Sequence, residues 1–244
     1  MNKVAGYITR KTMLYKTGVE YGDYTMNHVL GCAHGCKYPC YAFMLKKRFG
    51  QVPTYEDWLK PYLVSNTLEL LDKEIPRLQD KISSVELCFT TDPFMYGYDE
   101  IETMSLAAIK KLNDNGVKCS ILTKGILPAK LAKLSKENEH GITLISLDES
   151  YRERFEPFPA PYIDRLDALK KLHYKGCKTW VSMEPYPTPN LETQDIGVLL
   201  EAVAFADKII FGRTNYNREV SSYFRHKEFY NQVARQVIDY CNER

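Results

Sequence analysis

Apolar and polar positions along the chain alternate in a way that predicts strands and helices in turn. Six short runs rich in β-branched and aliphatic residues have the length of buried strands. These predicted strands span residues 27–31, 85–90, 118–123, 142–146, 178–183 and 208–212. The stretches between them show helical periodicity, and the predicted helices span residues 65–78, 99–116, 127–134, 161–176 and 194–207. Because parallel strands need a crossover connection, which a helix supplies, the alternation predicts a parallel α/β sheet.

Polar segments follow every predicted strand. A cysteine-rich loop comes after the first strand, and the segments TTDPF, TKG, SLDES, EP and GRTNYN follow the other five. The pattern allows an open doubly wound sheet or a complete or partial barrel. In each of these folds the chemistry collects at the carboxyl ends of the strands, so the candidate site lies there.

The composition predicts one cytoplasmic domain over residues 1–244. With 44% hydrophobic and 26% charged residues, the chain can bury a large core. It begins without an apolar signal region and contains no run of the roughly 18 apolar residues that a membrane span needs, so we expect no membrane contact. The net charge of +2 gives no overall basic field, so nucleic acid is a conceivable partner that the composition does not favour.

Three cysteines crowd into the loop after the first predicted strand. Cys32, Cys36 and Cys40 belong to a set of seven, and this odd number without a signal peptide argues for reduced thiols. A zinc site would need a fourth ligand such as His34 or His28, and the cysteine spacing fits zinc badly. Three thiolates instead suit an iron–sulfur cluster in which one iron stays open.

The cysteine loop resembles that of a known family. Residues 31–42, GCAHGCKYPCYA, are similar to the GC-x-HGC-x-YCYA loop of the spore photoproduct lyase-like branch of the radical S-adenosylmethionine (SAM) superfamily, with Pro39 inserted before the last cysteine. The resemblance continues in chain order over residues 27–217. Its further segments are TTDPF, LTK, ISLDES, FEPFPAP and RLDALKKL.

This resemblance implies a fold and an activity. The fold would be a partial (β/α)6 TIM-like barrel with parallel strands. Cys32, Cys36 and Cys40 would hold a [4Fe-4S] cluster, and reductive cleavage of SAM would give a 5'-deoxyadenosyl radical that abstracts hydrogen from an unidentified substrate. The electron would come from a donor such as flavodoxin or ferredoxin. The subclass of the enzyme, lyase or another, stays open.

The resemblance also implies a SAM site at the strand ends. Thr91 and Asp92 would hold the amino group of SAM, and Lys124 would neutralise its carboxylate. Tyr38 or Tyr41 would pack beside the adenine. The remaining candidates for cofactor binding, at the ends of the last three predicted strands, are Ser146, Glu184, Arg213 and Asn215.

Cys88 is a candidate for catalysis. Strand alternation would place Cys88 on the same face as Thr90 and Asp92, where it could donate hydrogen to a substrate radical. A buried free cysteine is also a common small core residue. The sequence leaves both roles open.

Two other functions compete with the radical SAM enzyme. One is a non-catalytic module that binds zinc or an iron–sulfur cluster through the same loop. The other keeps the radical chemistry and directs it to repair of a DNA lesion. The chain lacks an obvious DNA-binding addition, which argues against the second alternative.

Overall fold

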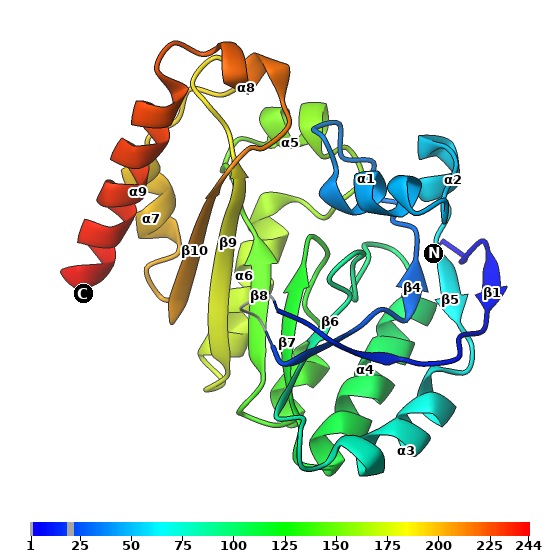
Figure 1. Cartoon of the computed structure of the whole chain (residues 1–244). Helices are drawn as coiled ribbons and strands as arrows, with labels where there is room; N and C mark the ends of the chain where they lie inside the picture. The colour runs from blue at the N-terminus through cyan, green and yellow to red at the C-terminus, as the bar shows by residue number, and fades with distance from the viewer. Residues whose placement is uncertain (1, 19–21) are drawn as a thin grey trace.

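A computed structural model describes residues 2–18 and 22–244, and a seven-stranded sheet dominates it (Figure 1). The strand order is β10-β9-β8-β7-β6-β3-β2, and every neighbouring pair is parallel except β2 with β3. Within the described part of the chain, β10 and β2 do not pair, so the sheet is not closed into a barrel. Its strands are β2 (Leu14–Lys16), β3 (Tyr24–Met26), β6 (Ser84–Leu87), β7 (Lys118–Thr123), β8 (Glu139–Thr143), β9 (Lys178–Tyr186) and β10 (Lys208–Arg213).

This architecture confirms the predicted fold class, an open α/β barrel with parallel strands, but corrects its first strand. The segment predicted as that strand, residues 27–31, leaves the main sheet after β3. Its strand β4 (Val29–Leu30) pairs with β5 (Tyr62–Val64) in a separate sheet of order β1-β5-β4, in which β1 is Gly6–Ile8.

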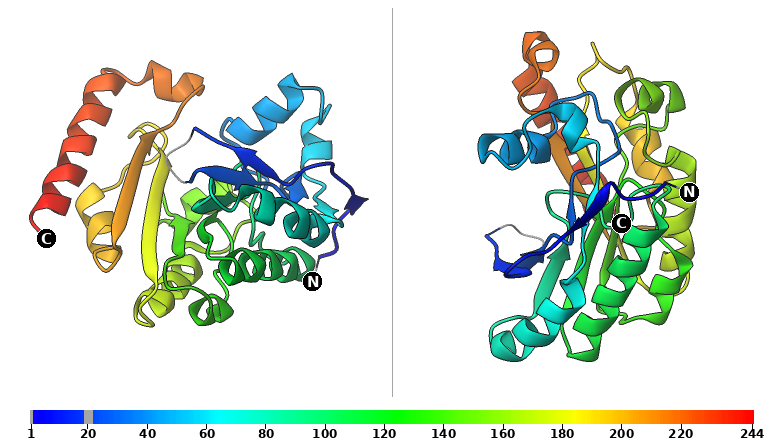
Figure 2. Two further views of the ribbon diagram at one scale, coloured as in Figure 1. Left: turned by 60° about the horizontal axis from the view of Figure 1, so that its bottom comes forward. Right: turned by 90° about the vertical axis from the view of Figure 1, so that its right-hand side faces the viewer.

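Helices pack on one face of the main sheet (Figures 1 and 2). Each of the five predicted helices corresponds to a helix in the structure, and these are α3 (Thr67–Leu78), α4 (Asp99–Asp114), the 3-10 helix η1 (Ala129–Lys133), α6 (Tyr162–His173) and α7 (Ile196–Ala202). The sequence pattern did not predict the other helices, which are α1 (Tyr41–Arg48), α2 (Tyr55–Trp58), α5 (Glu149–Phe155), α8 (Arg218–Ser222) and α9 (His226–Asn242). No helix of the described residues is long and apolar enough to cross a membrane.

The sequence of α4 shows why the predicted helices form. Its residues Ile101, Ala108 and Leu112 are fully buried at helical spacing and face the core. The helix ends where Gly116 adopts a φ of 76°, a left-handed conformation that glycine takes without steric cost. The amide of Val117 then donates to the carbonyl of Leu112 at 3.0 Å and satisfies one of the last helical carbonyls.

The two faces of the main sheet differ in polarity. On β6, Val85 and Leu87 belong to the main hydrophobic core, whereas Glu86 between them lines a cavity on the opposite face. Thr143 on β8 and Ser182 on β9 line the same cavity and lie directly opposite each other in the sheet register. The inner face of the sheet therefore carries polar side chains in positions that are buried.

Candidate active site

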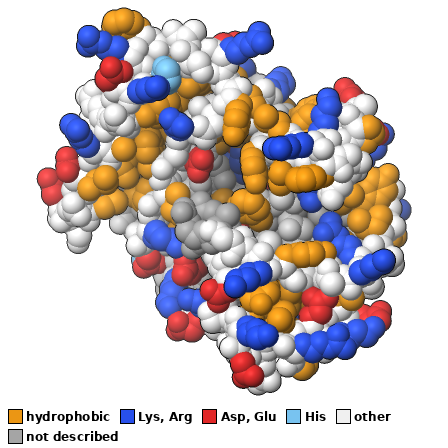
Figure 3. Space-filling view, in the orientation of Figure 1, with side chains coloured by type: hydrophobic (Ala, Val, Ile, Leu, Met, Phe, Trp, Pro, Cys, Tyr) orange, Lys and Arg blue, Asp and Glu red, His pale blue; other side chains and the backbone are white. Residues whose placement is uncertain are grey.

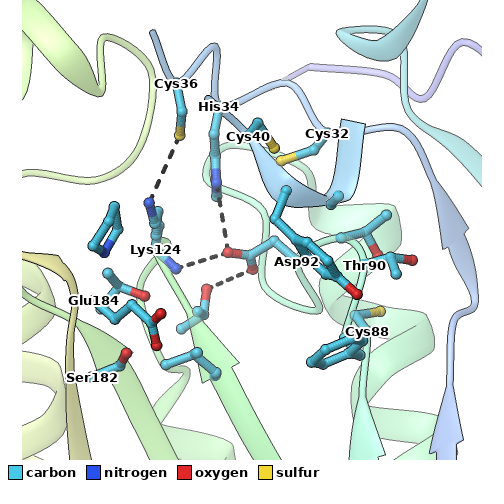
Figure 4. A pocket seen from close by; sticks show the side chains of 18 of the residues that line it. Cys32, His34, Cys36, Cys40, Cys88, Thr90, Asp92, Lys124, Ser182 and Glu184 are labelled. Carbon is cyan, nitrogen blue, oxygen red and sulfur yellow. Dashed lines mark hydrogen bonds and ion pairs between the residues drawn. The ribbon is translucent and has the colours of Figure 1, made fainter. Parts of the chain in front are cut away.

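A cavity of about 700 Å³ lies at the carboxyl ends of the parallel strands (Figure 4). The space-filling view shows a hollow near the middle of this face, bordered by hydrophobic side chains (Figure 3). The cysteine loop and the loops after β6 and β7 contribute to its walls. We call it the central cavity.

Two glycines shape the cysteine loop. Gly31 has a φ of 88°, and a Cβ there would lie 2.6 Å from the carbonyl oxygen of Lys60. Gly35 has a φ of 65°, and its Cβ would lie 2.6 Å from the ring of Phe158. The loop is thus pressed between the segment after α2 and the segment after α5, and only glycine fits at both points. This packing holds the loop over the strand ends.

The three cysteines of the loop all line the central cavity. Burial, followed by mutual repulsion of the thiolates, raises the pKa of Cys32 well above its usual value and that of Cys40 to about 11. Burial also raises the pKa of Cys36, against the opposing effect of the Lys124 charge. Three thiolates here would need a cationic partner to offset their repulsion.

The donor set fits a multi-iron cluster better than a single ion. Among the described residues, no three His, Cys, Asp or Glu side chains converge closely enough to hold one metal ion. The thiols of Cys32, Cys36 and Cys40 nevertheless border one cavity and interact electrostatically. A cluster binds each thiolate through a different iron, so its ligands do not have to meet at one atom.

Asp92 is fixed at the centre of the cavity wall. Its carboxylate accepts hydrogen bonds from the amide of Phe94 at 2.8 Å, the hydroxyl of Thr123 at 2.6 Å and the amide of Lys124 at 2.7 Å. The side chain of Asp92 is buried. These donors set the direction of the carboxylate.

His34 lies beside Asp92 inside the cysteine loop. Burial lowers the pKa of His34 to about 4, so the imidazole is neutral at pH 7. Its Nε2 accepts from the amide of Tyr96 at 3.3 Å, which leaves the proton on Nδ1, 3.6 Å from the Asp92 carboxylate. His34 therefore holds the loop through Tyr96 and Asp92.

Lys124 belongs to a buried ion-pair network that the sequence analysis missed. Its Nζ donates to Glu156 at 2.6 Å, and the other oxygen of Glu156 accepts from Arg165 at 3.0 Å. The hydroxyl of Tyr38 also donates to Glu156, and Lys124 lies 4.6 Å from the centre of the Tyr38 ring. Glu156 and Arg165 are completely buried.

Charges in this network hold each other ionised. Burial alone would raise the pKa of Glu156, but Lys124 and Arg165 outweigh it and lower that pKa to about 2. Burial likewise opposes the charge of Lys124, yet Cys36 and Glu156 raise its pKa. The Nζ of Lys124 lies 3.8 Å from the sulfur of Cys36, so the network places a fixed cation next to the cysteine loop.

Sequence comparison identifies the family. A family model described as the Radical SAM superfamily matches residues 26–202. The chain belongs to the radical SAM superfamily. This match supports the prediction of a radical SAM enzyme that binds SAM.

Two curated relatives carry the description uncharacterized protein. ORF301 of Acidianus two-tailed virus is 29% identical over 196 residues, which is 76% of this chain and 64% of the relative. MJ0683 of Methanocaldococcus jannaschii is 28% identical over 181 residues, which is 73% of this chain and 66% of the relative. The chain thus spans slightly less than two thirds of the length of either.

Solved structures share the radical SAM fold. A spore photoproduct lyase variant with bound AdoMet (SAM) and dinucleoside spore photoproduct matches with a TM-score of 0.67 and 17% identity, over 93% of this chain and 65% of that protein. Streptococcus suis SuiB bound to SAM matches with a TM-score of 0.56 and 15% identity, over 90% of this chain and 44% of SuiB. Identities this low show the fold alone, and they agree with the resemblance to the spore photoproduct lyase branch.

Most of the predicted site residues of this radical SAM protein reach the central cavity. Ten of the thirteen line it, namely Cys32, Cys36, Tyr38, Cys40, Tyr41, Cys88, Thr91, Asp92, Lys124 and Glu184. Ser146, Arg213 and Asn215 are not among its lining residues. Ser146 is buried and its hydroxyl accepts from the amide of Asp148 at 3.0 Å, whereas Arg213 and Asn215 are exposed and bond to each other at 3.0 Å.

A left-handed turn, and not the strand alternation that the sequence suggested, places Cys88 in the cavity wall. Strand β6 ends at Leu87, and Cys88 has a φ of 58°, so strand alternation does not extend to Thr90 or Asp92. This left-handed turn buries Cys88 in the cavity wall, with its sulfur 3.5 Å from Nδ1 of His28. Burial raises the pKa of the Cys88 thiol to about 12.

The residues that sequence reasoning missed had signals in the radical SAM segments. Glu156 is the acid of FEPFPAP and Arg165 is the first residue of RLDALKKL, so both lay in segments already matched. Glu86 left only the signal of a charged residue inside an apolar strand. One oxygen of Glu86 is buried with no hydrogen-bond partner among the described residues, and burial raises the pKa of its carboxyl to about 8.

Proposed function

We propose that this chain binds a [4Fe-4S] cluster through Cys32, Cys36 and Cys40 and uses it to cleave SAM reductively. The observation that supports this function best is the convergence of three partly buried thiols from one loop on a cavity that Asp92 and Lys124 also line. When bound, the reduced cluster would supply the electron that breaks a carbon–sulfur bond of SAM and yields a 5'-deoxyadenosyl radical for hydrogen abstraction.

The cavity residues would hold SAM by charge and shape. Asp92 and the neighbouring Thr91 suit the amino group, because the Asp92 carboxylate is fixed by three donors. Lys124 suits the carboxylate as a cation that Glu156 holds in place. Tyr41 is better placed than Tyr38 to cover the adenine, since Tyr38 is tied to Glu156.

The Cys88 thiol in the cavity wall suits hydrogen donation to a substrate radical. With its pKa raised by burial to about 12, it keeps its hydrogen at neutral pH, which a donor to a carbon radical requires. An external protein such as flavodoxin or ferredoxin would deliver the electron. Repair of a DNA lesion is a second candidate, supported by the fold likeness to a lyase structure that holds a dinucleoside spore photoproduct.

Anaerobic reconstitution tests the proposed function. We expect about four iron and four sulfide per chain and formation of 5'-deoxyadenosine when SAM and dithionite are added. Cys36→Ala should lose both, since it removes one of three thiol ligands. Cys241→Ala is the matched control because Cys241 is an exposed free cysteine at the end of α9. A Cys36→Ala protein with the full iron content and product yield would refute the assignment.

A further inference from the structure

A second cavity, of about 630 Å³, lies between the N-terminal segment and α1. Three cationic side chains line it, Arg10, Lys11 and Lys46. The hydroxyl of Thr12 and the amide of Gln51 add uncharged hydrogen-bonding groups, and none of the described residues that line it carries a carboxylate. We call it the cationic pocket.

The charges of this pocket are not compensated. Within residues 2–18 and 22–244, neither Arg10, Lys11 nor Lys46 takes part in an ion pair, whereas seven other lysines do. Burial, and then the charge of Arg10, lowers the pKa of Lys46. The described part of the chain thus holds Lys46 and Arg10 near each other without a counter-ion among its own side chains, an arrangement that a bound anion would stabilise.

The cationic pocket and the central cavity share a wall. Asn27 lines the cationic pocket, and its side-chain oxygen accepts from the amide and the hydroxyl of Thr90 at 3.0 and 2.9 Å. Thr90 lines the central cavity. On β3, Thr25 also lines the cationic pocket, and its hydroxyl donates to the backbone carbonyl of Glu86 at 3.1 Å. The hydrogen bonds of Asn27 with Thr90 and of Thr25 with Glu86 therefore link the linings of the two cavities.

We propose that the cationic pocket binds a phosphate group. Arg10 offers a planar set of donors that matches phosphate oxygens in pairs, Lys11 and Lys46 add point charges, and Thr12 and Gln51 can complete the hydrogen bonds. Without a carboxylate in its lining, the pocket does not favour a cation. The phosphate is either part of a nucleic-acid backbone or belongs to a free nucleotide or inorganic phosphate. Binding does not require the cluster or SAM.

Fluorescence anisotropy of the full chain with a labelled single-stranded oligonucleotide tests the proposal. We expect Arg10→Gln/Lys46→Gln to bind roughly tenfold more weakly, with a salt slope smaller by about 1.4 because two phosphate contacts are lost. The control Lys130→Gln/Lys133→Gln removes the same charge from exposed positions on η1 outside the pocket. It should keep the affinity and the slope of the unchanged protein.

Competition separates the two sources of phosphate. If AMP or inorganic phosphate at low millimolar concentration displaces the oligonucleotide, the pocket takes a free phosphate group. If only a second oligonucleotide displaces it, the pocket takes a backbone. The proposal is overturned if the Arg10→Gln/Lys46→Gln protein and the control bind the oligonucleotide, AMP and inorganic phosphate alike. Since cluster-free protein is used, this result is independent of the reconstitution experiment.

Discussion

Glu156→Gln should lower the free energy of unfolding by about 3 to 5 kcal/mol. Glutamine keeps the shape of the side chain but leaves Lys124 and Arg165 as buried cations without the carboxylate that pairs with both. Urea unfolding of the cluster-free chain at pH 7 would measure the difference. The control Glu137→Gln removes an exposed carboxylate paired with Lys178 and should change stability little.

The pH dependence of this effect follows from the low pKa of Glu156. Because that pKa falls from 4.5 in the unfolded chain to about 2 in the folded one, the carboxylate contributes stability above about pH 4.5. The contribution is lost as pH falls through about 2. The difference in the free energy of unfolding between the unchanged protein and Glu156→Gln, called the gap below, should therefore be constant from pH 5 to 8 and shrink below pH 4.5. A gap that widens in acid would contradict the ion-pair assignment.

Glu86→Gln should have the opposite effect from Glu156→Gln, because it should raise the free energy of unfolding in alkaline solution. The folded pKa of Glu86 is raised from 4.5 to about 8, so the unfolded chain ionises first as pH rises. Stability is then lost between about pH 4.5 and 8, by roughly 5 kcal/mol in total. Glutamine cannot ionise, so the variant should match the unchanged protein at pH 4 and exceed it by roughly that amount at pH 9.

Urea unfolding at a series of pH values would test the Glu86 effect. Glu137→Gln serves again as control, because Glu137 is an exposed glutamate with a lowered pKa and should not remove the alkaline loss of stability. Parallel curves for Glu86→Gln and the unchanged protein would show that Glu86 is ionised in the fold. In that case, burial would not keep the Glu86 carboxyl protonated, and the prediction would be contradicted.

The fold was predictable where local patterns determine structure. Buried positions at helical spacing and a terminal glycine placed α4 correctly, and strand periodicity found five of the six parallel strands. The first strand was misplaced because residues 29–30 pair with β5, more than thirty residues along the chain. Which sheet a short apolar run joins depends on such distant partners, and periodicity does not contain that information.

The site residues could be predicted only where the ends of the strands were predicted correctly. The predicted strand 142–146 lies three residues late, since β8 is Glu139–Thr143, and Ser146 accordingly falls outside the central cavity. Arg213 ends β10 and Asn215 follows it at the edge of the sheet, where their side chains meet solvent. The link from Lys124 to Glu156 spans 32 residues and exists only in the folded chain.

The polar side chains on the inner face of the main sheet determine which kind of ligand the central cavity binds. Glu86, Thr143 and Ser182 are polar residues that line this cavity. An apolar ligand would leave each of these polar groups without a hydrogen-bond partner, at a cost of about 1 to 3 kcal/mol for each group. A ligand with its own hydroxyl or amide groups can form hydrogen bonds with them. The cavity therefore selects against apolar compounds at the binding step, before any reaction begins.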